Sequence, residues 1–275
     1  MPRPGGHHVR HEVYCTGEQP RASSARGPVR VDLLFFGAVT RVSITVDFEP
    51  DCPPYLSTTF RGIEEGAPKL LRLFADTGIT ATYFTTGDVA RRFPEQVLAV
   101  VDAGHELGCH GMSHTAFDAM DASTAKWEIE QSAAILREFA PVTSFRAPYL
   151  RFPERHVSLL ESADFLLDSS LAKYKRSYYA RRTPTSLTRI AASMTSSVYR
   201  LPRLIRDTWM RQLSDPVVLF VHPWEFVDLT ATKLRYDCRF RTGDFALRAL
   251  REVIELFQRA DATFLPMCEL GGVRG

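Results

Sequence analysis

The sequence predicts an α/β protein whose strands form a distorted or incomplete (β/α) barrel of about seven strands. Short β-branched, apolar runs alternate with longer segments of helical periodicity along most of the 275 residues. This alternation is typical of parallel strands joined by right-handed crossovers. Seven or so such units within roughly 230 residues favour a barrel over an open sheet.

The first half of the chain alternates regularly between the two kinds of segment. Residues 42–48, VSITVDF, are β-branched and apolar, as in a buried strand. A glycine at position 78 is expected to end the first helix. The expected elements are strands over 42–48, 79–87 and 105–110, and helices over 64–78 and 88–104, the second broken near Pro94.

The alternation continues in the second half with one interruption. A helix over 121–139 is expected to be capped near Ser123 or Thr124. Further strands are expected over 143–149, 164–170, 216–226 and 262–267, and further helices over 153–163 and 242–260. Residues 171–215, rich in Tyr, Arg and Ser, fit the pattern poorly and are interpreted as an irregular insertion that shapes a substrate cleft. The barrel domain therefore spans 41–270, preceded by a disordered extension over 1–40.

Composition excludes several classes of function. The net charge of +2 and the scattered arginines argue against nucleic-acid binding. No apolar run approaches the ~18 residues of a membrane helix, so no transmembrane segment is predicted. The short run over 31–39 resembles part of a signal peptide but lacks an evident cleavage site, so export is disfavoured. The five cysteines are odd in number and form no CxxC pair, which favours a reducing cytoplasm.

Polar and metal-capable side chains follow the predicted strands. A barrel assembles its active site where strands deliver their C-terminal ends. Burying one such polar side chain without a partner costs free energy. Several of them at the ends of neighbouring strands are therefore expected to face one another across a site. The residues at these ends are Asp47, Glu49, Asp51, His110, His114, Arg146, Asp168 and His222.

Metal-assisted acid–base chemistry is the function that this set predicts. Two imidazoles, His110 and His114, with one carboxylate can bind zinc or another divalent ion and leave positions open for water. Asp47 and Glu49 are two apart on a strand and share a face, so one can bind metal while the other accepts a proton.

Supporting roles fall to the remaining strand-end residues. His222 can protonate a leaving group, Arg146 can orient the carboxylate base, and Asp168 can orient His222. Each signal alone is weak: HxxxH is common, and without the glutamate of HExxH a zincin protease is disfavoured. The metal-site hypothesis rests on the occurrence of all these residues together at strand ends.

Five motifs in order resemble those of the polysaccharide deacetylase family, the NodB-homology carbohydrate esterases. They are TVDFEPD, HGMSH, RAPY, DSS and VLFVHPWE, and the similarity runs over about residues 42–268. The resemblance implies a distorted (β/α) barrel that removes an acyl group, usually acetyl, from an amide nitrogen of a sugar with the help of a divalent metal. The implied roles are base for Asp47, metal ligands for His110 and His114, acid for His222, and support from Arg146 and Asp168.

The first motif departs from the family pattern. The family's adjacent aspartate pair would place the metal carboxylate at position 48, which is Phe48 here. By similarity to branches with a spaced motif, Glu49 inherits that role, and Asp51 is the alternative.

The expected function is that of a cytoplasmic, zinc-dependent hydrolase that removes an acetyl or formyl group from an N-acylated amino sugar, or from a lipid-linked or polymeric glycan. One alternative is an allantoinase-like amide hydrolase that needs little or no metal. Another is a carbohydrate-binding protein that has kept the barrel and lost catalysis. Sugar binding alone needs no base and acid, so Asp47, Arg146 and His222 argue against this last alternative.

Overall fold

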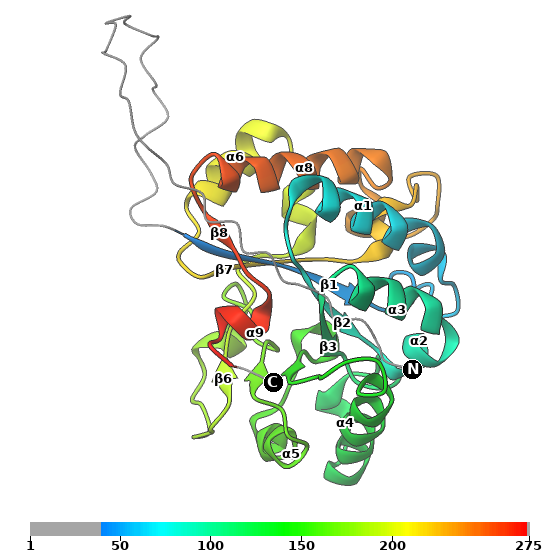
Figure 1. Cartoon of the computed structure of the whole chain (residues 1–275), viewed down its shortest axis with the longest axis vertical. Helices are drawn as coiled ribbons and strands as arrows, with labels where there is room; N and C mark the ends of the chain where they lie inside the picture. The colour runs from blue at the N-terminus through cyan, green and yellow to red at the C-terminus, as the bar shows by residue number, and fades with distance from the viewer. Residues whose placement is uncertain (1–39, 274–275) are drawn as a thin grey trace, which may run out of the picture. The chain divides into compact units, whose positions relative to one another are not determined.

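A computed structural model describes residues 40–273, so all but the last residue of the predicted extension over 1–40 lies outside the described residues. Parallel strands form one curled sheet in this part of the chain (Figure 1). The strands are β1 (Arg41–Phe48), β2 (Thr82–Thr85), β3 (Glu106–Cys109), β4 (Ser144–Phe145), β5 (Leu167–Asp168), β6 (Thr188–Arg189), β7 (Val217–Val221) and β8 (Thr263–Phe264). The helices are α1 (Ala67–Thr77), α2 (Gly87–Arg92), α3 (Pro94–Asp102), α4 (Ala122–Leu136), α5 (Val157–Ser162), α6 (Arg203–Arg211), α7 (Tyr236–Arg239), α8 (Asp244–Gln258) and α9 (Met267–Leu270).

The order of the strands gives an incomplete barrel, as predicted. Neighbouring strands follow the order β6-β5-β4-β3-β2-β1-β7, and β8 pairs with the start of β1. Among the described strands, the outer two, β6 and β7, do not pair with each other. Ser193, just after β6, instead donates its backbone N–H to the carbonyl of Val218 in β7 at 2.8 Å. A single residue thus joins the two edges of the curled sheet.

Strand β1 lies at the centre of the core. Every residue from Val42 to Phe48 is buried, because β1 pairs with β2, β7 and β8 and helices cover the sheet. Helices α1 and α8 run side by side over it and direct Leu70, Phe74 and Phe257 inward (Figure 1). Burying each such side chain stabilises the fold by roughly 2 kcal/mol.

Local signals placed the helix ends well. Gly78 ends α1 in the left-handed conformation (φ 65°), as expected. The predicted helix over 88–104 is split into α2 and α3 at Phe93, directly before Pro94. The cap of α4, expected near Ser123 or Thr124, is Asp121, whose carboxylate accepts the N–H of Thr124 at 2.7 Å. An aspartate one turn earlier satisfies the same exposed backbone donor.

The predicted strands over 143–149 and 164–170 are much longer than β4 and β5. Pro148 cannot donate to a ladder, and Tyr149 turns into the left-handed region (φ 60°), so β4 ends early. The segment 171–215 also contains elements that were not predicted, the edge strand β6 and helix α6.

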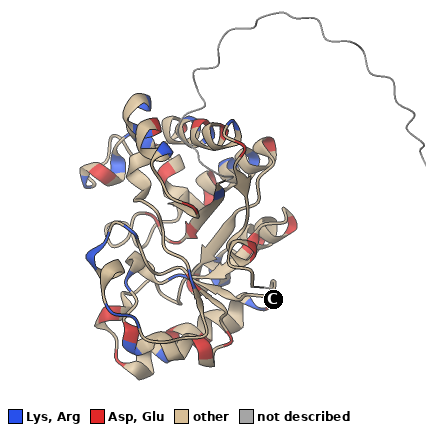
Figure 2. Cartoon of the chain, turned by 90° about the vertical axis from the view of Figure 1, so that its left-hand side faces the viewer, with Lys and Arg blue, Asp and Glu red and all other residues tan. Residues whose placement is uncertain are grey.

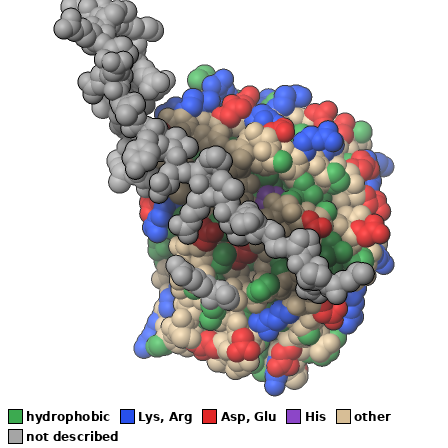
Figure 3. All heavy atoms as spheres, in the orientation of Figure 1, with side chains coloured by type: hydrophobic (Ala, Val, Ile, Leu, Met, Phe, Trp, Pro, Cys, Tyr) green, Lys and Arg blue, Asp and Glu red, His purple; other side chains and the backbone are tan. Residues whose placement is uncertain are grey.

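Charged side chains of both signs are interleaved over the helices (Figures 2 and 3). No helix within residues 40–273 has the length and apolar character needed to cross a membrane.

Candidate active site

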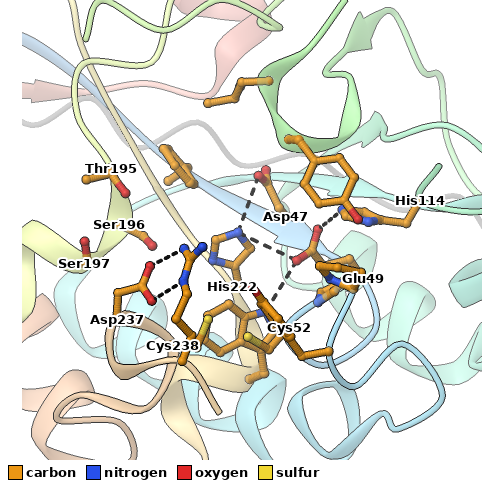
Figure 4. A pocket seen from close by; sticks show the side chains of 18 of the residues that line it. Asp47, Glu49, Cys52, His114, Thr195, Ser196, Ser197, His222, Asp237 and Cys238 are labelled. Atoms are coloured by element: carbon orange, nitrogen blue, oxygen red, sulfur yellow. Dashed lines mark hydrogen bonds and ion pairs between the residues drawn. The ribbon is translucent and has the colours of Figure 1, made fainter. Parts of the chain in front are cut away.

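The C-terminal ends of β1, β3, β4 and β7 place polar side chains around one cavity of about 350 Å³. Asp47 and Glu49 come from the end of β1, His114 from the loop after β3, and His222 from the residue after β7 (Figure 4). Because parallel strands end at one edge of the sheet, residues far apart in the sequence meet there.

Glu49, His110 and His114 form a compact cluster of possible metal ligands. One ligand atom from each lies within 4.8 Å of the others, and all three residues are buried. Glu49 Oε2 is 2.5 Å from His114 Nε2 and 3.4 Å from His110 Nε2. The structure therefore brings together the three residues predicted as the metal site.

The tautomer of His110 fits a metal ligand. His110 Nδ1 lies 2.7 Å from the carbonyl oxygen of Arg146, which only accepts hydrogen bonds, so Nδ1 carries the proton. Its Nε2 is then a bare acceptor, buried and without a hydrogen-bond partner. A backbone carbonyl that fixes the ring in this way is common behind metal-binding histidines.

Asp51, the alternative ligand, has another task. Its two carboxylate oxygens accept the backbone N–H groups of Arg61 and Gly62 at 2.9 and 2.7 Å. These groups open the π-helical segment η1 (Gly62–Gly66), whose first N–H groups need acceptors. Among the carboxylates after β1, Glu49 alone joins the histidine cluster.

Asp47 is held by a buried arginine. Arg146, fully buried, donates from Nη1 to Asp47 Oδ1 at 2.7 Å and to Thr45 Oγ1 at 2.6 Å. Its Nη2 donates to Ser169 Oγ at 2.9 Å, and its guanidinium lies over the ring of Phe84 at 4.2 Å. Contacts from three sides fix the guanidinium and hence the carboxylate, as predicted for the orienting arginine.

His222 is oriented by Glu225, not by Asp168. The Glu225 carboxylate accepts both the His222 ring Nδ1–H at 2.8 Å and the His222 backbone N–H at 3.0 Å. Glu225 is itself buried against Arg200 at 3.1 Å and the Tyr199 hydroxyl at 2.9 Å. The indole of Trp224 stacks on a face of the His222 ring, with ring centroids 4.9 Å apart.

The predicted bond between Asp168 and His222 is wrong. Asp168 accepts Arg189 Nε at 3.0 Å and the backbone N–H of Ser170 at 2.8 Å. It lies at the end of β5, next to the edge strand β6 and far from β7 in the strand order. Asp168 braces the edge of the sheet.

Asp47 and His222 lie near each other. His222 Nε2 is 4.0 Å from Asp47 Oδ2 and 3.7 Å from Glu49 Oε1. The expected placement of the two residues on opposite sides of the metal stays a prediction. The proximity suits amide hydrolysis, since the attacking oxygen and the departing nitrogen are bonded to the same carbon. A base and an acid can serve the two atoms from neighbouring positions.

Electrostatics favour the charged forms of Glu49 and His222. Burial raises the pKa of Glu49, but the charges of His114 and His222 and a hydrogen bond from His114 outweigh it and leave the pKa well below its usual range. Burial lowers the pKa of His222, but Glu49, Glu225 and Asp47 together raise it to about 9. His222 therefore carries a proton to donate at neutral pH.

Three supporting residues were missed by the sequence analysis. Glu225 and Trp224 stand in the quoted motif VLFVHPWE, and a glutamate three residues after the histidine was the available signal. Glu128 of α4 accepts the N–H groups of Met112 and Ser113 at 2.7 and 3.0 Å and so braces the loop between the two histidines. Nothing in the sequence near Glu128 signalled this contact.

Two glycines bring η1 against the loop that carries His222. A Cβ atom at Gly62 would overlap the backbone nitrogen of Trp224, and one at Gly66 would overlap the carbonyl oxygen of Pro223. The backbones of η1 and of η7 (Pro223–Phe226) consequently touch directly.

Known proteins are similar to this chain in sequence and in fold. The sequence profile of the family described as polysaccharide deacetylase matches residues 39–167. This part of the chain is therefore similar to the polysaccharide deacetylase family. A peptidoglycan deacetylase of Helicobacter pylori is 33% identical over 159 residues, which are 57% of this chain and 54% of that protein. The chain spans about half the length of the curated relatives it matches.

Solved structures of the family share the fold. A polysaccharide deacetylase structure from Mycobacterium smegmatis has a TM-score of 0.64 at 21% identity and covers 86% of this chain and 94% of that one. A family 4 carbohydrate esterase pseudoenzyme from Bacillus anthracis has a TM-score of 0.59 at 14% identity. The matched region covers 85% of this chain and 66% of the pseudoenzyme chain. The fold of this chain thus occurs both in proteins named as deacetylases and in a pseudoenzyme.

Proposed function

We propose that the protein is a metal-dependent hydrolase that removes an acyl group, acetyl in the first place, from the amide nitrogen of an amino sugar in a glycan. The observation that carries the proposal is the grouping at one cavity of an arginine-fixed carboxylate, Asp47, a glutamate-fixed imidazole, His222, and the Glu49–His110–His114 cluster. Similarity to peptidoglycan deacetylases supports a polymeric or otherwise linked amino sugar as the substrate.

Glu49, His110 and His114 would hold the divalent ion. One carboxylate and two imidazoles suit zinc and leave further positions open. When bound, the ion supplies Lewis acidity to the acyl carbonyl and makes a nearby water molecule more acidic. Nδ1–H of His110 stays on the Arg146 carbonyl, so the ring presents its bare Nε2 to the cluster throughout.

Asp47 acts as the base. Its Oδ1 is engaged by Arg146, while Oδ2 faces His222 and the cavity and is the oxygen placed to accept a proton from the attacking water. Arg146 keeps the carboxylate in one orientation, which matters because proton transfer needs a donor and an acceptor at hydrogen-bond distance.

His222 acts as the acid. An amine is a poor leaving group unless it is protonated, and His222 presents Nε2–H toward the same side of the cavity as Asp47 Oδ2. Glu225 holds Nδ1–H and favours the doubly protonated ring. The departing nitrogen takes the Nε2 proton as the carbon–nitrogen bond breaks.

Two alternatives are separated from this proposal by experiment. The experiment measures acetate and formate release from N-acylated glucosamine oligomers by protein stripped of metal and then resupplied with zinc. We expect activity to depend on zinc and to be lost in Asp47→Asn, with Asp102→Asn, an exposed aspartate at the end of α3, as the matched control. Full activity in the stripped protein would support the allantoinase-like alternative. Sugar binding without acyl release under every condition would support a binding protein.

The cellular location stays a prediction. Cys52, Cys109, Cys238 and Cys268, the cysteines within the described residues, are free thiols, in keeping with the reducing compartment that the sequence favours.

A further inference from the structure

Two cations form a ridge between the catalytic cavity and a neighbouring one. Arg151 and Lys175 line both the cavity that contains Asp47 and His222 and a second cavity of about 460 Å³. Arg155 and Arg182 also line the second cavity, whose described carboxylates are Asp118 and Glu154. The lining of the second cavity therefore holds four cations and two carboxylates.

Those two carboxylates do not neutralise the ridge. Glu154 already pairs with Arg182 at 3.3 Å and with Arg189 at 2.9 Å. Asp118 reaches only Arg151, at 3.7 Å, with both side chains about half exposed. Such an exposed pair contributes little, about 0–1 kcal/mol.

Lys175 has no described carboxylate within 4.0 Å, and its Nζ donates to the carbonyl oxygen of Tyr149. The pKa of Lys175 is lowered, first by burial and then by the charge of Arg151, while Asp118 opposes the shift weakly. Two like charges kept together at the edge of a cavity destabilise the free protein, and an anion placed between them would relieve that cost.

The turn that precedes these two cations has a strained backbone and lies beside the active site. Tyr149 and Leu150 both have left-handed backbone angles, φ 60° and 51°. Each such conformation costs a non-glycine residue of order 1–3 kcal/mol and persists where the surroundings hold it. The turn sets the Tyr149 ring on His114, with ring centroids 4.7 Å apart, while its carbonyl meets Lys175 and the next residues form the ridge. An anion at Lys175 and Arg151 would thus lie at the wall of the catalytic cavity.

We propose that Arg151 and Lys175 form a subsite for an anionic group, a carboxylate or a phosphate, carried by the N-acylated sugar substrate. The inference rests on the proposed function, because it assigns the group to the substrate of the same cavity. Lys175 supplies a point charge with free N–H donors, and Arg151 supplies a planar fork that matches two oxygens of either anion. The preferred substrate is then an acidic or phosphate-bearing amino sugar, and a neutral chain is a poorer one.

The test compares three N-acetylglucosamine-based tetramers with the zinc-loaded protein. One is neutral, one carries the carboxylate of N-acetylmuramic acid at alternate sugars, and one carries a 1-phosphate. We expect KM to be lower for one or both charged tetramers than for the neutral tetramer. The charged tetramer with the lower KM identifies the anion that the subsite binds. Lys175→Gln and Arg151→Gln should each raise that KM about tenfold, the loss of one charge-assisted hydrogen bond, and should change the KM for the neutral tetramer much less.

Controls separate this subsite from general effects of charge. Lys175→Arg should retain most of the preference, and Lys126→Gln, which removes an exposed cation from α4, should behave as wild type. Arg151 is exposed, so its variant remains informative if Lys175→Gln fails to fold. Equal KM values for all three tetramers, or equal losses on neutral and charged ones, would overturn the subsite.

Failure of the proposed function gives a different result. If no tetramer releases acetate, the deacylase proposal falls, and calorimetric titration with N-acetylglucosamine 1-phosphate and with N-acetylmuramic acid decides the subsite alone. Binding of either that is weakened about tenfold in Arg151→Gln supports it, whereas absence of binding of both to wild type overturns it.

Discussion

The two halves of the sheet are built differently. Strands β1, β2 and β3 have eight, four and four residues, whereas β4, β5 and β6 have two each. The long-stranded half provides Asp47, Glu49, His110 and His114, the groups proposed to react or bind metal. The short-stranded half provides Arg146, the strained turn after it and the wall of the cleft. Its backbone has few ladder bonds, and side chains such as Ser169, Ser170 and Arg189 hold it instead.

This contrast suggests a division of labour. The reacting groups follow strands with continuous backbone hydrogen bonding, which holds their positions firmly. Loops of the short-stranded half select and orient the substrate. Changes in the first half should affect every substrate strongly, and changes in the second should act through positioning or selectivity.

The largest effect is expected from Glu49→Gln in the long-stranded half. The neutral amide keeps the shape but removes the only carboxylate of the cluster, so bound zinc and activity should both be lost. The loss of metal affinity should exceed the roughly 10–100-fold that removal of an outer partner causes. Elemental analysis and acetate release check this together. Retained zinc with full activity would show that the metal lies elsewhere.

Asp47→Asn should come next. We expect turnover to fall by about 100-fold or more with zinc content intact, because the proton acceptor is lost and the metal ligands remain. Zinc content is measured beside acetate release, with Asp102→Asn as the control. Loss of zinc along with activity would exchange the roles assigned to Asp47 and Glu49.

Arg146→Ala tests whether the short-stranded half only supports the chemistry. We expect a smaller fall in turnover than in Asp47→Asn, with a loss of about 3 kcal/mol in the free energy of unfolding, because Asp47 is left buried without its partner. Urea unfolding and turnover are measured on the same samples. An equal or larger loss of turnover in a folded variant would break the contrast between the halves.

Glu225→Gln should shift the pH dependence with a modest loss of activity at neutral pH. His222 has a pKa raised to about 9, so wild-type activity should decline as the pH rises through that value and the acid loses its proton. Removing the Glu225 charge lowers the pKa of His222, and the decline should begin at lower pH.

Folding stability should also fall as the pH rises: the contribution of protonated His222 is complete below about pH 6.5 and is lost as the pH rises toward 9. Rate profiles from pH 5 to 10, both proteins loaded with zinc, isolate the effect; an unchanged alkaline limb would contradict it.

The smallest effect is expected from Ser169→Ala. It removes one of the hydrogen bonds to Arg146 and should cost about 1 kcal/mol in unfolding free energy and a few-fold in turnover. Thermal unfolding and acetate release measure both. A loss as large as that of Arg146→Ala would mean that the short strands hold the guanidinium more firmly than the other contacts do.

The sequence predicted the fold and the cluster at the strand ends because both depend on regular periodicity. Strand ends converge in any parallel barrel, so Glu49, His110 and His114 could be placed together without knowledge of packing. The partner of His222 could not be found in this way. Asp168 was inferred from a strand end, whereas Glu225 reaches back within its own short turn, a local contact fixed by backbone geometry after β7. The lengths of β4 and β5 were overestimated because apolar composition does not reveal where a left-handed turn or a serine side chain ends a ladder.

The direct contact between η1 and η7 gives the catalytic groups a common reference. Gly62 and Gly66 let the chain that continues from Asp47, Glu49 and Asp51 rest on the very backbone that carries His222. One short segment, residues 47–66, therefore sets the relative positions of the base, the metal ligand and the acid. The far edge of the sheet does not set them. The alignment on which proton transfer depends therefore does not require pairing between β6 and β7, which do not pair among the described strands.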